Sequence, residues 1–90
     1  MTETAVEEKV KSKAKIVDSN DLIIYNDDVN SFDHVISSLM KVCKHESIQA
    51  EQCTWIIHHN GKCAVKNGAF NNLKPMCDAL CERGIDAKIH

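Results

Sequence analysis

The sequence lacks any apolar run near the roughly 20 residues that a helix needs to cross a bilayer. It also lacks a basic excess, because 11 lysines and arginines stand against 13 acidic residues, for a formal net charge of −2. Binding to nucleic acid or to an anionic membrane requires a basic face. We therefore expect neither nucleic acid nor a membrane as a partner. Residues 1–15 are polar and lack the apolar segment of a secretion signal, so we expect a cytoplasmic protein.

Paired cysteine motifs are missing as well. The chain has five cysteines, an odd number, and no two of them are separated by just two residues. A secreted disulfide framework normally has an even number of cysteines. A reducing compartment is the natural expectation.

Ninety residues form one domain at most. A chain of this length buries about 60–65% of the surface that its unfolded form exposes, which leaves little room for a large catalytic cleft. Residues 1–19 are mostly Thr, Glu, Lys, Ser and Ala, with too little apolar surface to offset the entropy of ordering them. We predict a flexible N-terminal extension over 1–19, although a frayed helix would have the same composition, and a folded domain over 20–90.

Apolar patterning over the folded part predicts six elements in the order β-α-α-β-α-β. The run at 22–25 predicts a strand buried on both faces. Apolar spacings of three and four predict three helices, at 32–43, 50–57 and 70–81. Two further runs predict strands, at 62–66 and 85–89. A three-stranded antiparallel sheet with three helices makes an α/β (α+β) two-layer sandwich.

Boundary signals accompany these elements. Asn30 or Ser31 can cap the first helix, and Ser47 the second. Asn60-Gly61 ends the second helix, and Asn67-Gly68 predicts a turn after the second strand. Pro75 either kinks the third helix or delays its start to about residue 73.

The most polar turn is Asn26-Asp27-Asp28, directly after the first predicted strand. Adjacent carboxylates there can bind a metal, act as an acid/base pair or meet a cation, but they also serve as ordinary turn residues. No calcium-loop pattern follows them. His58-His59 closes the second helix, where a histidine suits the helix dipole or can hydrogen-bond a ligand.

An alternative function uses Cys77 and Cys81, which are spaced i, i+4 on one helix. Together with His58 and His59 they offer four ligands for a small zinc-binding or redox protein. Two cysteines on an apolar stripe are more often small core residues, so we expect no metal and no cofactor. No cysteine is marked as a nucleophile beside a base, and we do not expect an enzyme.

Two motifs together resemble the ClpS adaptor family. Leu22–Asp28 is similar to its apolar strand followed by Asn-Asp-Asp, and Ile57–Lys62 is similar to its apolar-His-x-x-Gly-Lys run. The separation of the motifs and the order of the elements also match, over about residues 21–90. The resemblance implies a ClpS-like fold and an adaptor, or N-recognin. Such an adaptor binds substrates by a destabilising N-terminal Phe, Tyr, Trp or Leu and delivers them to a Clp AAA+ protease.

The resemblance also implies roles for individual residues. The substrate's α-amino group would be held by Asn26, Asp27 and His58. The residues implied for the side-chain pocket are Ile24, Asp28, Asn30, Phe32, Thr54, Ile57 and Ile85. Phe32 and Thr54 stand where the family often has Met, so the preferred N-terminal residue can differ in this chain.

The implied partner is the N-terminal domain of a Clp AAA+ unfoldase, ClpA or a relative, with Lys74 as a docking residue and the N-terminal extension entering the unfoldase. We expect a monomer. A third hypothesis is a structural interaction module similar in topology to a ribosomal stalk domain. A passive module would need neither the Asn-Asp-Asp nor the His motif.

Overall fold

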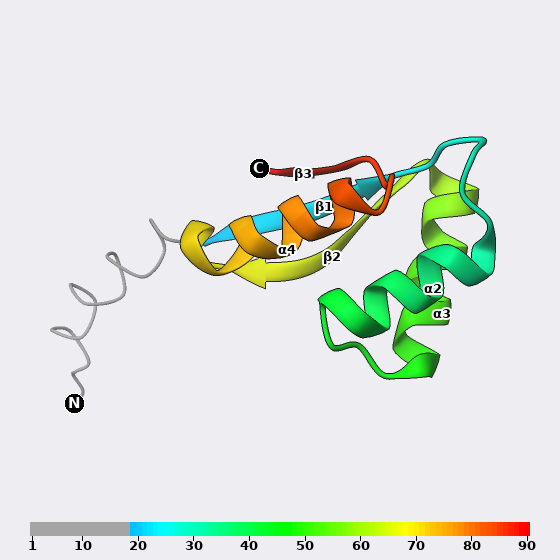
Figure 1. The fold of residues 1–90 in the computed structure, drawn as a ribbon, viewed down its shortest axis with the longest axis horizontal. Helices are drawn as coiled ribbons and strands as arrows, with labels where there is room; N and C mark the ends of the chain where they lie inside the picture. Colours follow the sequence, from blue (N-terminus) through cyan, green and yellow to red (C-terminus); the bar gives the residue numbers. More distant parts are fainter. Residues whose placement is uncertain (1–18) are drawn as a thin grey trace, which may run out of the picture.

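The structure is a computed structural model that describes residues 19–90. The predicted extension at 1–19 therefore lies, apart from Ser19, outside the described residues. The predicted order β-α-α-β-α-β is confirmed (Figure 1). The elements are β1 (Asn20–Tyr25), α2 (Phe32–Val42), α3 (Ser47–Asn60), β2 (Lys62–Gly68), α4 (Phe70–Glu82) and β3 (Ala87–Ile89). Within 19–90, no helix is long and apolar enough to cross a membrane.

The sheet has the order β2-β1-β3, and both pairings are antiparallel, as predicted. Figure 1 shows α4 lying along the sheet, with α2 and α3 together at the end where β1 finishes and β2 begins. At that end Tyr25 pairs with Lys62, and the N–H of Asn26 donates to the carbonyl of Gly61 at 2.8 Å. The end of β1 is thereby fixed beside the C-terminal end of α3.

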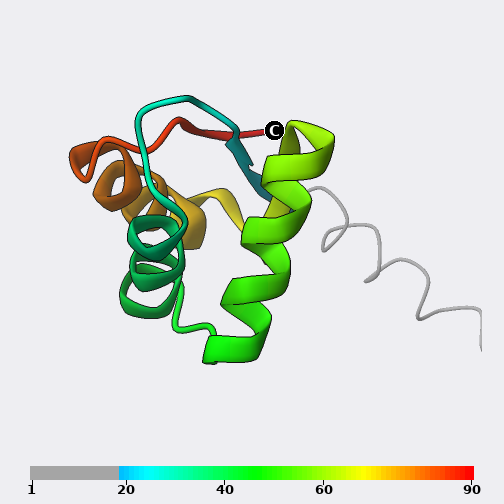
Figure 2. The same ribbon diagram turned by 90° about the vertical axis from the view of Figure 1, so that its right-hand side faces the viewer.

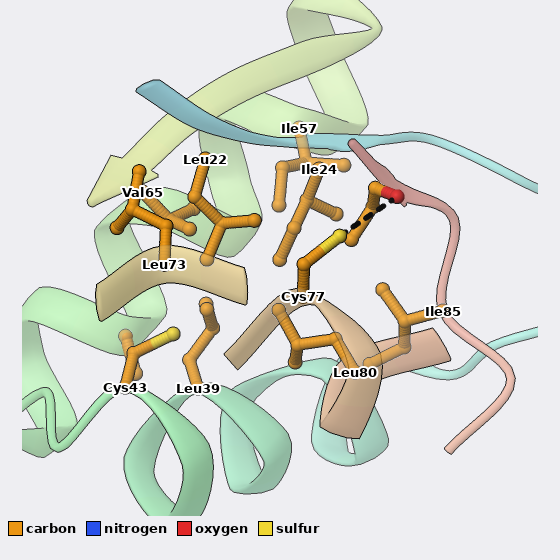
Figure 3. Close-up of a cluster of buried hydrophobic side chains, with 12 residues drawn as sticks. Leu22, Ile24, Leu39, Cys43, Ile57, Val65, Leu73, Cys77, Leu80 and Ile85 are labelled. Carbon is orange, nitrogen blue, oxygen red and sulfur yellow. Dashed lines mark hydrogen bonds between the residues drawn. The ribbon is translucent and has the colours of Figure 1, made fainter. Parts of the chain in front are cut away.

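The core lies between one face of the sheet and the helices (Figure 3). Its largest apolar side chains that are at most 1% exposed come from β1, α2 and α4: Leu22, Ile24, Leu39, Leu73 and Leu80. The prediction that β1 is buried on both faces is wrong, because Ile23 and Tyr25 are only half-buried. The described helices pack against the Leu22 and Ile24 side alone, which explains the alternation along β1.

Local chemistry sets most element ends. The Ser31 hydroxyl accepts the N–H of His34 at 3.1 Å and caps α2, as predicted. Gly61 ends α3 with φ of 92°, a left-handed conformation that glycine adopts without a steric penalty.

Three boundary predictions need correction. Ser47 is the first residue of α3, and Glu46 occupies the cap position without a side-chain hydrogen bond. Asn67 and Gly68 continue β2 instead of turning, because they pair with Asp21 and Asn20 of β1. The helix α4 begins at Phe70 and contains Pro75 in its second turn, where the proline removes one backbone donor.

A β-bulge in the β1–β2 pairing depends on a buried histidine. Leu22 pairs with Lys66 and Ile23 with Ala64, so Val65 is passed over in the register. The Nε2 of His45 lies 2.8 Å from the carbonyl oxygen of Val65, and because a carbonyl only accepts, this nitrogen carries the proton. The His45 side chain, 6% exposed, thus ties the segment between α2 and α3 to the bulge.

We predict that His45→Ala lowers the free energy of unfolding by about 1–3 kcal/mol, because it leaves the Val65 carbonyl buried without its donor. Urea denaturation followed by circular dichroism measures the change. Lys41→Ala, which shortens an exposed side chain on α2, should stay within about 0.5 kcal/mol of wild type. Equal losses in the two variants would contradict a special role for His45.

Candidate functional site

A pocket of about 390 Å³ lies where the loop after β1 meets the start of α2 and the end of α3. We call it the loop pocket. Its lining comes from two segments that are distant in sequence, residues 26–35 and residues 54–58. The Asn26–Gly61 backbone hydrogen bond holds the first segment beside the end of the second. The lining residues are Asn26, Asp27, Asp28, Asn30, Ser31, Phe32, Val35, Thr54, Ile57 and His58.

The structure brings the predicted α-amine residues together, because Asn26, Asp27 and His58 all line the loop pocket. Most of the predicted side-chain residues line it too: Asp28, Asn30, Phe32, Thr54 and Ile57. The roles assigned to these residues remain predictions.

Ile24 and Ile85 do not line the loop pocket itself. They line a neighbouring cavity of about 20 Å³, which shares Asn26, Asp27 and Ile57 with it. Both isoleucines are nearly fully buried core residues, so they support the pocket from behind. Lys74 lies on α4 and lines none of these cavities.

Ser31 and Val35 also line the loop pocket, although neither is among the site residues predicted from the sequence. Ser31 was expected as a helix cap, which it is, but its position at the start of α2 also places it at the pocket. Val35 was part of an apolar stripe expected in the core. Its spacing of three from Phe32 was the available signal, because residues i and i+3 share one face of a helix.

Asp27 organises the loop that forms the pocket wall. Its Oδ1 accepts the backbone N–H groups of Val29 and Asn30, each at 2.9 Å, and its Oδ2 accepts the Asn30 amide at 2.9 Å. The Asn30 backbone bond is the largest influence and lowers the pKa of Asp27, with partial burial opposing it. Asp27 therefore carries its negative charge throughout the neutral range.

Asn30 connects this loop to the turn after α4. Its side-chain nitrogen donates one hydrogen to Asp27 and the other to the carbonyl of Gly84, both at 2.9 Å. The same turn is held against α2, since His34 Nε2 lies 2.8 Å from the Arg83 carbonyl and Arg83 Nε donates to the Ser38 hydroxyl at 2.7 Å. The loop is thus braced from two sides.

Aromatic and hydroxyl side chains shape the rest of the pocket. The rings of Phe32 and His58 meet edge to face, with centroids 5.3 Å apart, so the first turn of α2 contacts the last turn of α3. The Thr54 hydroxyl donates to the Ala50 carbonyl at 2.8 Å within α3. Its proton is therefore already used inside the helix.

The lining divides into a polar and an apolar part. Asn26, Asp27, Asp28 and His58 offer amide, carboxylate and imidazole groups, whereas Phe32, Val35 and Ile57 offer hydrocarbon. Among residues 19–90, no lysine or arginine lines the pocket. Carboxylates and amide oxygens accept hydrogen bonds from a cation. The arrangement suits a small cationic group attached to an apolar side chain.

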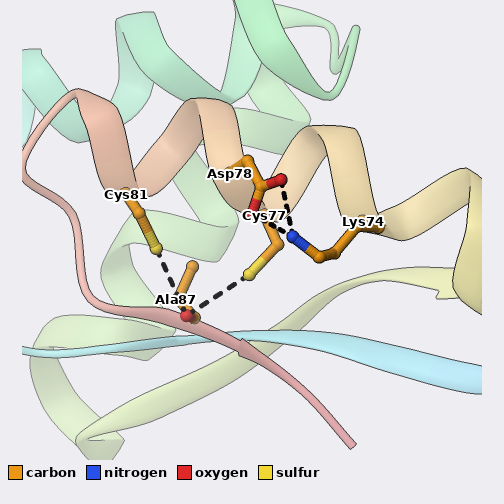
Figure 4. A network of polar contacts seen from close by, with 5 residues as sticks. All are labelled: Lys74, Cys77, Asp78, Cys81 and Ala87. Atoms are coloured by element: carbon orange, nitrogen blue, oxygen red, sulfur yellow. Dashed lines mark hydrogen bonds and ion pairs between the residues drawn. The ribbon is translucent and has the colours of Figure 1, made fainter.

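The four ligands of the zinc alternative are not brought together. Cys77 and Cys81 both approach the carbonyl oxygen of Ala87, at 3.4 and 3.6 Å (Figure 4), whereas His58 lines the loop pocket at the end of α3. Between residues 19 and 90, no three His, Cys, Asp or Glu side chains gather closely enough to hold a metal. The geometry gives this alternative no support.

Three of the cysteines are not activated as nucleophiles either. Burial raises the pKa of Cys77, with the neighbouring Cys81 adding to the effect. Burial likewise raises the pKa of Cys43 and of Cys63 to about 11. These thiols stay protonated at neutral pH, whereas a nucleophilic cysteine needs its thiolate.

Comparisons with known proteins point to one family. The family model described as ATP-dependent Clp protease adaptor protein ClpS matches residues 15–87. A solved structure, that of Agrobacterium tumefaciens ClpS2 bound to L-phenylalaninamide, is similar with a TM-score of 0.74 and 15% identity. The match covers 81% of this chain and 95% of that one, and at this identity it shows the fold alone. No curated protein matches the chain.

We predict that the Asp27 carboxylate stabilises the domain at neutral pH and loses this effect in acid. Because folding lowers its pKa, the contribution is complete above the unfolded value of about 3.9 and disappears as the pH falls through the lower folded value. The gap in unfolding free energy between wild type and Asp27→Asn should therefore be constant from pH 7 to pH 5 and shrink below pH 4.

Urea titrations across this pH range measure the gap. Asp28→Asn is the matched control, because Asp28 is exposed and makes no side-chain hydrogen bond to residues 19–90. If the difference in unfolding free energy between wild type and Asp27→Asn is unchanged down to pH 2, the stabilising role of the Asp27 carboxylate is contradicted.

Proposed function

Because this chain belongs to the ClpS family of ATP-dependent Clp protease adaptor proteins, we propose that it binds substrates by their N-terminal residue and delivers them to a Clp AAA+ protease. The observation that carries the proposal is the meeting of Asn26, Asp27 and His58 at one pocket with an apolar part. These groups come from the end of β1 and the end of α3, which the backbone holds side by side.

The polar groups suit an α-ammonium. Such a group carries one positive charge and three donors, so it needs several acceptors. The Asn26 amide and a neutral His58 supply acceptors, and the charged carboxylate of Asp27 supplies the complementary charge. An internal or acetylated residue cannot satisfy this set, and each polar group left without a partner would cost about 1–3 kcal/mol. Selection for a free N-terminus follows.

The apolar part suits a large first side chain. Burying Phe, Tyr, Trp or Leu beside Val35 and Ile57 would contribute about 1.5–3 kcal/mol, and a volume of about 390 Å³ can take one such side chain. The bound L-phenylalaninamide of the similar Agrobacterium structure supports this ligand class, since it combines a free α-amine with an aromatic side chain.

Phe32 and Thr54 adjust the pocket relative to the family. Thr54 is smaller than the methionine that often stands there, which leaves additional depth, and it uses its hydroxyl proton within α3. Phe32 is larger and more rigid than methionine, and its ring is in contact with His58. We propose that aromatic and leucine N-termini bind, and that the added depth also admits β-branched residues.

The proposed partner is the N-terminal domain of a Clp AAA+ unfoldase, met in the cytoplasm by a monomeric adaptor. Lys74 on α4 is the proposed docking cation. It is half exposed and forms an ion pair with Asp78 at 2.7 Å (Figure 4). The hydrogen bond to Asp78 raises the pKa of Lys74, so the lysine is fully charged at neutral pH.

We predict that a peptide beginning with Phe binds at least about tenfold more tightly than its N-acetylated form, because acetylation removes the charge and two donors. Asp27→Ala and His58→Ala should each weaken binding of the peptide with a free N-terminus by about tenfold. Isothermal titration calorimetry with Phe-, Leu- and Ala-starting peptides measures these affinities.

His90→Ala serves as the histidine control, since His90 is exposed and lies outside the loop pocket. It should bind the Phe peptide as wild type does. Equal binding of free and acetylated peptides would overturn the proposed function.

We also predict that Lys74→Ala weakens binding to the N-terminal domain of the unfoldase by about two- to fivefold, the range expected for a solvent-exposed ion pair. The loss should shrink at high salt. Biolayer interferometry measures it, with Lys66→Ala on β2 as the control. Unchanged peptide binding in Lys74→Ala would separate docking from substrate recognition, and unchanged docking would remove Lys74 from the interface.

A further inference from the structure

A second hollow lies beside the loop pocket, between α2 and α3. It measures about 210 Å³ and is lined by Phe32 and Ile36 of α2 and by Glu51 and Trp55 of α3. We call it the helix groove. Figure 2 shows the two helices side by side on this part of the molecule. Because Phe32 also lines the loop pocket, a single aromatic side chain separates the two hollows.

The walls of the helix groove are apolar, exposed and already held in place. Trp55 is 56% exposed and Phe32 is 41% exposed, although both are large apolar side chains. The Trp55 indole stacks on His59, with ring centroids 3.7 Å apart and an interplanar angle of 13°. The Phe32 ring meets the His58 ring edge to face, with centroids 5.3 Å apart and an interplanar angle of 73°. A ligand would therefore meet walls that need little further ordering.

We propose that the helix groove binds the side chain of the third residue of the substrate, and that it prefers arginine or lysine there. This inference rests on the proposed function, because it takes the α-amine and the first side chain as held in the loop pocket. In an extended peptide the side chains of residues 1 and 3 point to the same side, roughly 7 Å apart. That spacing leaves room for the one ring of Phe32 between them. The second side chain points away.

The chemistry of the groove selects a long cationic side chain. Glu51 precedes Trp55 by four residues on α3, so the carboxylate and the indole share one helix face. Glu51 makes no ion pair with any residue of the described part. The apolar stem of an arginine would lie against Ile36 and Phe32 while its planar guanidinium stacks on Trp55 and meets Glu51. Lysine supplies the charge without the planar stack, so arginine is preferred.

Four peptides that begin with Phe and differ only at residues 2 and 3 test the proposal. Their starts are Phe-Ala-Arg, Phe-Ala-Ala, Phe-Ala-Glu and Phe-Arg-Ala, with no other aromatic residue. We expect arginine at the third position to bind about two- to fivefold more tightly than alanine, the range of an exposed cation–π contact. Glutamate there should bind less tightly than alanine, because Glu51 repels it.

The protein contains its own reporter of groove occupancy. Trp55 is the only tryptophan in the chain, so its fluorescence should respond to the peptide with arginine at the third position and far less to the alanine peptide. Glu51→Gln and Trp55→Ala should each remove most of the arginine advantage in calorimetry. Ile48→Ala is the matched control, because Ile48 is 67% exposed on the same helix and lines neither hollow. It should keep the full advantage.

The outcomes separate this inference from the proposed function. If arginine and alanine at the third position bind equally while acetylated peptides are still rejected, the helix groove proposal is overturned and the adaptor function stands. A full arginine advantage at the second position would overturn the assignment to the third. If free and acetylated peptides bind alike, both proposals fall.

Discussion

The pairing of β1 with β2 is the constraint on which the site depends. Tyr25 pairs with Lys62 at the last position of the ladder, and the Asn26 N–H continues the pattern to the Gly61 carbonyl. Gly61 can serve at this point because its left-handed backbone ends α3 and sends the chain straight into β2. The carboxylate-bearing loop and the histidine-bearing helix end are thereby joined through main-chain atoms. The strand pairing thus places the two segments side by side, and side-chain packing adds further contacts between them.

The loop between β1 and α2 is held by its own hydrogen-bond network. Asp27 accepts three hydrogen bonds within its own turn, and Asn30 extends the network to the Gly84 carbonyl. Arg83, next to Gly84, is in turn bonded to Ser38 of α2. The turn after α4 is thus hydrogen-bonded both to the loop and to α2. A change in the position of α4 can therefore shift Asn30, which lines the loop pocket, through a short chain of hydrogen bonds.

The sequence predicted the element order more accurately than it predicted the exposure of β1 or the element ends. Eight of the ten site residues implied by the family resemblance line the loop pocket, and their roles remain predictions. Spacings of three and four identified the helices, because burial of one helix face imposes that period. A short apolar run does not say whether one face of a strand or both are covered, and Ile23 shows that the second face remained partly open. Ser47 and Asn67-Gly68 misled because cap and turn residues also occur inside regular elements when tertiary pairing outweighs local preference. The bulge at Val65 depends on His45, a contact across 20 residues with no local signature.

The main-chain link between Asn26 and Gly61 has a consequence for binding kinetics. A pocket assembled from two independent segments would have to close around its ligand, and the cost of ordering it would slow association. Here the two walls share a hydrogen-bonded joint, so the cavity exists before any ligand arrives. Under the proposed function, N-terminal residues would then differ mainly in their dissociation rates. A residue that fits poorly would bind as fast as one that fits well but would dissociate sooner. If the chain binds N-termini as proposed, this joint between Asn26 and Gly61 favours rapid binding and rapid release of each protein end.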